Sequence, residues 1–119
     1  MVRIGIFVSW LLVFVYGVVI FYFSCLPSKC VPQLFPFSDK VYHYIEYFPF
    51  GVLLVRAFWV TFKRLDRRAL LLFLFVIVLY ALSDEIHQLF VSGRFFSYGD
   101  ILVDVLGAAS GGFVYLWLR

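Results

Sequence analysis

The chain has 119 residues, of which 65% are hydrophobic and only 14% are charged. A soluble domain is normally about half apolar and about a quarter charged, so this composition favours a single-domain membrane protein over a soluble one. The formal net charge of +3 is small, and the basic residues form no stripe, which argues against nucleic-acid binding.

Four apolar segments predict transmembrane helices. The first, residues 4–25, has 22 residues without a charge and would be about 33 Å long as a helix, enough to cross a bilayer core. Three prolines make residues 26–38 a non-helical connector. Further helices are predicted at about 40–62, 69–91 and 98–118. We expect Ser38 or Asp39 to cap the second helix and Pro49 to kink it. The predicted fold is all-α, an integral membrane bundle of four transmembrane helices with short loops, forming one domain over residues 1–119.

The positive charges predict the orientation. Residues 63–68, KRLDRR, carry four of them in one short turn, and positively charged loops are retained in the cytoplasm. Arg3 and Arg119 then fall on the same side. We therefore predict a multi-pass protein of the cell membrane with both termini cytoplasmic.

Polar residues gather at the helix ends that this orientation places outside. Six of the seven acidic residues and both histidines fall there. Helical spacing puts several of them on shared faces, because residues three, four or seven apart lie on one side. These sets are Asp39, His43 and Glu46 in the second helix, Asp84, His87 and Gln88 in the third, and Asp100 and Asp104 in the fourth. Charged groups inside a membrane usually line a cavity or pair, so we predict a buried or half-buried polar site.

A stripe of small residues follows Asp104. Gly107, Ala108, Gly111 and Gly112 form two pairs of small residues four apart, a spacing that allows close helix contact. This stripe predicts that Asp100 and Asp104 also face the bundle.

The residue types indicate candidate roles. A histidine can act as general base and a desolvated carboxyl as general acid, which gives the catalytic candidates His43, Glu46, Asp84, His87 and Asp100. The substrate-binding candidates are Asp39, Lys40, Glu85, Gln88, Arg94 and Asp104, with Arg94 suited to binding a phosphate or a carboxylate through two N–H groups. The two histidines and several carboxylates could alternatively hold a divalent metal, although no HExxH-like spacing is present. The sequence identifies no cofactor and leaves the oligomeric state open.

Several of these residues could instead have simpler structural roles. Ser97 and Asp100 match a helix-capping box, Glu85 is offset by about 100° from Asp84 and could face solvent, and Lys40 and Arg94 could simply neutralise carboxylates. Cys25 and Cys30 are close enough in sequence to pair as a disulfide, without being required to.

The ordered motifs resemble those of the VanZ-like family. They are Asp39-Lys40-x-x-His43-x-x-x-Tyr47, then Asp84-Glu85-x-His87-Gln88-x-Phe90-x-x-Gly93-Arg94-x-x-Ser97-x-x-Asp100, then Asp104-x-x-Gly107-Ala108-x-x-Gly111. Ser92 stands where that family often has proline, and Asp104 where it often has asparagine. The resemblance implies a four-helix layout and a setting in the bacterial cell envelope. It also implies a link to resistance against the glycopeptide teicoplanin, but it supplies no reaction and no catalytic residues.

Three functions are consistent with these features. The first is an enzyme at the outer leaflet that acts on a lipid-linked or headgroup substrate. The second is a non-catalytic envelope protein, in which the polar cluster binds a ligand or locks the helices by ion pairs. The third is a small transporter or flippase, which four helices and a cluster at one face make less favourable.

Overall fold

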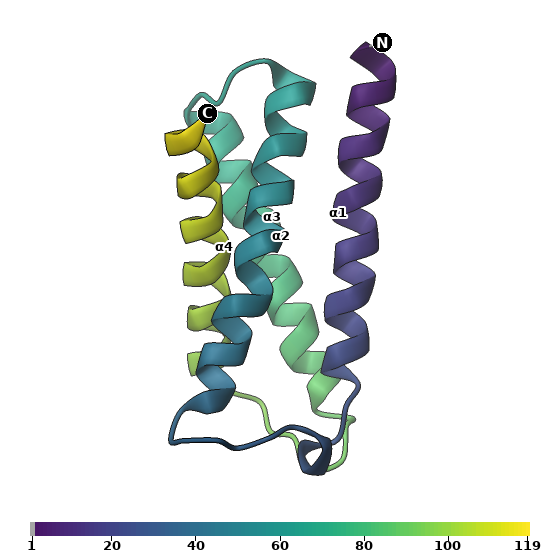
Figure 1. Cartoon of the computed structure of the whole chain (residues 1–119), viewed down its shortest axis with the longest axis vertical. Coiled ribbons are helices and arrows are strands. Elements are labelled where there is room, and N and C mark those ends of the chain that lie inside the picture. The colour runs from purple at the N-terminus through teal and green to yellow at the C-terminus, as the bar shows by residue number, and fades with distance from the viewer. Residues whose placement is uncertain (1) are drawn as a thin grey trace.

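The computed structural model describes residues 2–119, in which helices are joined by short loops (Figure 1). Its four α-helices are α1 (Val2–Ser24), α2 (Ser38–Phe62), α3 (Arg67–Gln88) and α4 (Tyr98–Leu118). A short 3₁₀ turn, η1 (Ser28–Cys30), lies in the connector between α1 and α2, and no strand occurs within residues 2–119. Each α-helix is long and apolar enough to cross a membrane. The predicted all-α bundle of four span-length helices is therefore confirmed.

The predicted helix bounds agree with the structure to within two residues, except at the end of the third helix. The third helix ends at Gln88 instead of residue 91, because the next three residues form single turns with bonds between residues three apart. Gly93, with φ +76°, then reverses the chain. The second helix begins at Ser38 after Phe37, whose φ is 66°, and Phe37 makes no side-chain capping bond. The predicted cap by Ser38 or Asp39 is thus absent among the described residues, and α2 continues through Pro49 without interruption.

Both chain ends lie at the same end of the bundle (Figure 1). The α2–α3 turn lies there too, whereas the α1–α2 connector and the α3–α4 loop lie at the opposite end. We call this opposite end the connector end. The first turns of α2 and α4 and the last turn of α3 meet there, so the predicted polar residues of three helices come to one end of the molecule.

Helices α2 and α4 cross with their backbones in direct contact at glycines. A Cβ atom at Gly51 of α2 would overlap the backbone carbonyl of Ala108, and one at Gly107 of α4 would lie 2.6 Å from the Tyr44 carbonyl oxygen. Gly107, Ala108, Gly111 and Gly112 are all buried. The predicted small-residue stripe is confirmed, and it turns the buried Asp100 and Asp104 toward α2.

Aromatic and aliphatic side chains of α2 and α3 form most of the core below the polar end. Its buried members are Ile20, Tyr47, Phe50, Leu54, Val55, Phe58, Phe73, Ile77, Ala81 and Ala108. Helix α1 stands at the edge of the bundle (Figure 1) and is joined to it partly by hydrogen bonds. Trp10 Nε1 donates to Thr61 Oγ1 at 2.9 Å, and Tyr16 O–H donates to the Glu46 carbonyl. Much of the remaining surface is exposed Leu, Val and Phe, which fits a bundle embedded in a lipid bilayer.

Candidate functional site

The polar ends of α2 and α4 are joined by a chain of charged contacts. Lys40 forms an ion pair with Asp100 and lies 3.3 Å from Asp39. His43 Nδ1 lies within hydrogen-bond distance of Asp104 Oδ1, at 2.8 Å, and its Nε2 lies 3.6 Å from Asp100 Oδ2. The His43 and Asp104 side chains are 7% and 0% exposed, so these contacts are shielded from solvent. We call Lys40, His43, Asp100 and Asp104 the α2–α4 network.

Glu85 joins α3 to this network through the start of α4. Ser97 Oγ accepts from the Asp100 backbone N–H at 3.2 Å, as the predicted capping box requires. The reciprocal bond comes from another helix, because the Ser97 N–H donates to Glu85 Oε2 at 3.1 Å. The Asp100 carboxylate is therefore not needed for the helix cap and pairs with Lys40 instead. The solvent-facing role considered for Glu85 is wrong, since this residue is 0% exposed.

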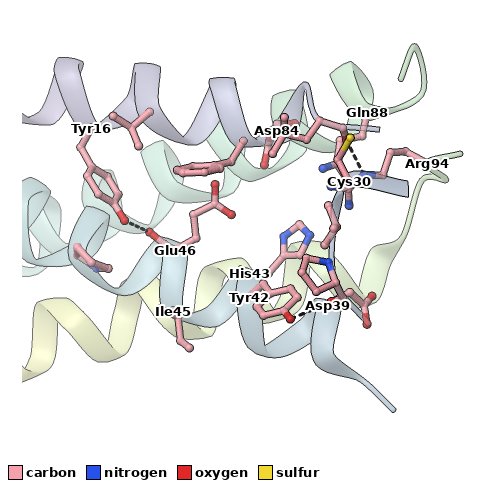
Figure 2. A pocket seen from close by; sticks show the side chains of 17 residues that line it. Tyr16, Cys30, Asp39, Tyr42, His43, Ile45, Glu46, Asp84, Gln88 and Arg94 are labelled. Atoms are coloured by element: carbon pink, nitrogen blue, oxygen red, sulfur yellow. Dashed lines mark hydrogen bonds between the residues drawn. The ribbon is translucent and has the colours of Figure 1, made fainter. Parts of the chain in front are cut away.

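A cavity opens beside the network, on the side of α2 that faces α1 and α3. Its volume is about 530 Å³. Its walls are largely apolar or aromatic and come from α1, the connector and α2. They include Tyr16, Val19, Phe23, Leu26, Val31, Pro32, Ile45 and Pro49. Polar groups line the remainder, namely Asp39, His43, Glu46, Asp84, Gln88 and Arg94, as shown in Figure 2.

The polar side chains in the cavity come from three elements. In Figure 2, Glu46 and His43 project from α2 on the side of Asp84, which belongs to α3. Asp84 is buried and accepts a hydrogen bond from the Tyr47 hydroxyl at 3.1 Å. Tyr47 is 0% exposed, so it fixes one Asp84 oxygen from the core side.

Glu46 and Arg94 line the cavity without an ion-pair partner. Within residues 2–119, no side chain of opposite charge lies within 4.0 Å of either. Arg94 Nε donates to the Leu26 carbonyl at 3.2 Å, which holds the guanidinium at the cavity edge. A half-buried carboxylate and a half-buried guanidinium are thus both directed at one space.

His87 is separated from the other candidates. Its ring stacks on Phe21 of α1, with the ring centroids 4.3 Å apart, and its nitrogens lie 3.2 Å from Ser24 Oγ and 3.6 Å from Cys25 Sγ. It contributes neither to the α2–α4 network nor to the cavity wall. Gln88 is buried and lines the cavity, whereas Asp39 lies at the rim with 39% of its side chain exposed. Cys25 and Cys30 are exposed free thiols.

Two overlapping groups of buried side chains could hold a metal ion. One combines His43, Asp84 and Asp104, and the other His43, Glu85 and Asp100. In each group, one nitrogen or oxygen atom from each of the three residues lies within 4.8 Å of the other two. Asp104 Oδ2 and Glu85 Oε1 are buried with no hydrogen-bond partner within residues 2–119.

The apolar half of the cavity was missed by sequence reasoning. Its residues from α1 and the connector are hydrophobic and are spaced like any lipid-facing residues, so no signal in the sequence separates them from the outer surface. Only the packing of α1 against α2 shows that they enclose a space.

The arrangement combines four chemical capabilities in one place. It offers a carboxylate–histidine pair, a further carboxylate at the cavity, a cation with no ion-pair partner in residues 2–119, and an apolar wall formed by span-length helices. Such a combination suits an amphipathic ligand, because the apolar part is favoured by the walls and the polar part by directed hydrogen bonds.

Comparison with known proteins gives a family. The model of the VanZ/LLP1 family matches residues 7–119, which is nearly the whole chain. Neither curated proteins nor solved structures gave a significant match. The match agrees with the ordered polar motifs and with the four span-length helices of a multi-pass membrane protein. The chain belongs to the VanZ/LLP1 family.

Proposed function

We propose that this protein binds the polar head of a membrane lipid, or of a lipid-linked cell-wall precursor, in the cavity between α1, α2 and α3. One observation carries the proposal. A cavity of about 530 Å³ has apolar walls within span-length helices, and it also contains Glu46 and Arg94 without ion partners in the described chain. Its volume lies in the usual range of about 300–1,000 Å³ for small-molecule sites.

The charges indicate which headgroup chemistry fits. The Arg94 guanidinium at the edge would bind a phosphate, which it can grip through two parallel N–H groups. Glu46 and Asp84 deeper in the cavity would accept hydrogen bonds from hydroxyl or amino groups. The apolar walls of α1 and α2 would hold the first part of the lipid chain.

The first prediction concerns Arg94. We expect R94M to weaken binding of undecaprenyl phosphate or phosphatidylglycerol by about tenfold or more, because one charge-assisted contact is worth about 1.5–3 kcal/mol. Lipid retained by the purified protein would be measured by native mass spectrometry. R64M is the matched control, since Arg64 lies in the α2–α3 turn with 79% of its side chain exposed.

A lipid without phosphate separates charge recognition from general lipid adhesion. Diacylglycerol should bind weakly to both variants and to the unaltered protein. Equal retention of phospholipid by R94M and R64M would contradict the proposed headgroup site.

We also propose that the cavity opens at the outer face of the bacterial membrane. The basic turn between α2 and α3 lies at the same end as both termini, and positively charged short loops stay in the cytoplasm. Alkaline phosphatase fused after Arg119 should therefore be inactive, while a fluorescent protein fused there should fluoresce. As a control, phosphatase inserted at residues 33–36 of the connector should be active. Active phosphatase at the C-terminus would reverse the orientation and place the cavity inside.

A second candidate is a purely structural role for part of the cluster. The α2–α4 network favours it, because Lys40 and Asp100 are paired with each other and His43 with Asp104. Such buried pairs can specify one helix arrangement without adding much stability. Teicoplanin resistance is not required by either candidate, and the lipid-binding test needs no antibiotic.

A further inference from the structure

The connector end of the bundle carries more buried negative charge than its basic groups neutralise. Six carboxylates are buried or half-buried there, namely Asp39, Glu46, Asp84, Glu85, Asp100 and Asp104. Within residues 2–119, the only lysine or arginine in an ion pair with any of them is Lys40, which contacts Asp39 and Asp100. Uncompensated charges within a helix bundle are costly, so the remaining carboxylates require protons or a cation.

We propose that His43, Asp84 and Asp104 form a binding site for one divalent transition-metal ion. All three side chains are buried, and one nitrogen or oxygen atom from each lies within 4.8 Å of the other two. One imidazole with two carboxylates is a donor set that suits Zn²⁺ or Mn²⁺. The ion would take the place of the proton that lies between His43 and Asp104, and this proton would be released to solvent on binding. Bonds of about 2.0–2.2 Å bring such ligand atoms to within about 3–4 Å of each other, so side-chain adjustment is enough to close the site.

A second observation points to a ligand at the same place. Asp104 is 0% exposed, yet its Oδ2 atom has no hydrogen-bond partner in residues 2–119. Its other oxygen already bonds to His43 Nδ1 at 2.8 Å. A buried acceptor on a carboxylate is expensive to leave unpaired, and an ion bound beside His43 would satisfy it.

The overlapping group of His43, Glu85 and Asp100 is the weaker alternative. Asp100 is already neutralised by Lys40, whose ammonium would repel a divalent cation. Glu85 Oε2 is engaged by the Ser97 N–H. Asp84, by contrast, accepts a side-chain hydrogen bond only from the neutral Tyr47 hydroxyl within residues 2–119, and this bond would orient it as partners of metal ligands commonly do.

The proposed ion would also be accessible. His43 and Asp84 line the cavity, whereas Asp104 closes the site from the α4 side. Three protein ligands with the remaining position open to a cavity is the arrangement of metal sites that bind a substrate or water. The metal site extends the proposed function, because the ion could bind an oxygen atom of the lipid headgroup in the cavity. Metal binding in detergent does not require a lipid, so each proposal can fail alone.

The test is metal binding by the full chain in detergent after chelator treatment. Zn²⁺ and Mn²⁺ would each be titrated by calorimetry, and bound metal would be counted by mass spectrometry. We expect one ion per chain, with affinity reduced at least about tenfold in D84N and in D104N, because even an indirect partner of a metal ligand commonly contributes that much. E85Q and D66N should bind like the unaltered protein. Asp66 lies at the other end, where it caps α3, and serves as the matched control.

Other outcomes are equally decisive. Binding lost in E85Q but kept in D84N and D104N would move the ion to the other group and overturn the assignment. If the unaltered protein binds no more metal than D104N does, the proposed site is refuted, and protons neutralise the carboxylates instead of a cation. If D84N and D104N fail to fold, X-ray absorption of the zinc-loaded protein decides together with E85Q, which should bind zinc in the same ligand shell as the unaltered protein. One imidazole with oxygen ligands is expected, and an all-oxygen or sulfur-containing shell would refute the site.

Discussion

Replacing His43 by leucine is expected to destabilise the folded bundle by about 3–5 kcal/mol, since removing one partner of a buried ion pair leaves the other charge uncompensated. The partner left behind is Asp104, which is 0% exposed and has His43 as its ion-pair partner. Asp100 would lose the same neighbour at 3.6 Å but would keep Lys40. The free energy of unfolding would be measured in mixed micelles with a chelator present, so that loss of a bound metal cannot contribute.

A double variant separates charge from packing. H43L/D104L replaces both partners by apolar groups, and such a replacement is often neutral or stabilising. We therefore expect it to recover most of the stability that H43L loses. If H43L alone costs less than about 1 kcal/mol, the size of an exposed pair, the α2–α4 network does not hold these helices together.

Adding a single methyl group at Gly51 should also have a large effect. A Cβ atom there would overlap the Ala108 carbonyl, which belongs to backbone and cannot rotate away. Helices α2 and α4 would have to separate along their contact, so we expect G51A to destabilise by about 3 kcal/mol or more, the upper part of the range for overpacking. Because this contact also brings Asp104 to His43, G51A should weaken lipid and metal binding together.

Gly5 supplies the matched control. The same change at Gly5 of α1 meets no atom within 4 Å, so G5A should be neutral or stabilise by up to about 1 kcal/mol through helix propensity. Both variants would be compared by thermal unfolding in the same detergent. Equal stability of G51A and G5A would contradict the close α2–α4 crossing.

The fold was largely predictable because its signals are local. Mainly apolar segments of span length predict the helices, and the spacing of Gly107 and Gly111 predicts which face of α4 packs closely. The end of α3 was not predictable, because Leu89, Phe90 and Val91 are as apolar as the helix before them. Only their bonding to residues three back shows that the helix has ended.

The site was predictable as a cluster but not in its detail. On α3, Glu85 lies about 100° to one side of Asp84 and His87 about 60° to the other, because each residue turns the helix by about 100°. The structure places α4 on the first side, where it buries Glu85, and α1 on the second, where it holds His87. The sequence shows these angles but does not show which helix stands on which side. For the same reason the apolar cavity wall could not be foreseen.

The most direct test of the headgroup site is a crystal structure of the protein grown in a lipidic mesophase that contains phosphatidylglycerol. We predict lipid density in the cavity, with a phosphate within hydrogen-bond distance of Arg94 and the headgroup directed toward Glu46 and Asp84. A cavity closed by side chains, with Arg94 paired to a carboxylate of the protein, would contradict the account.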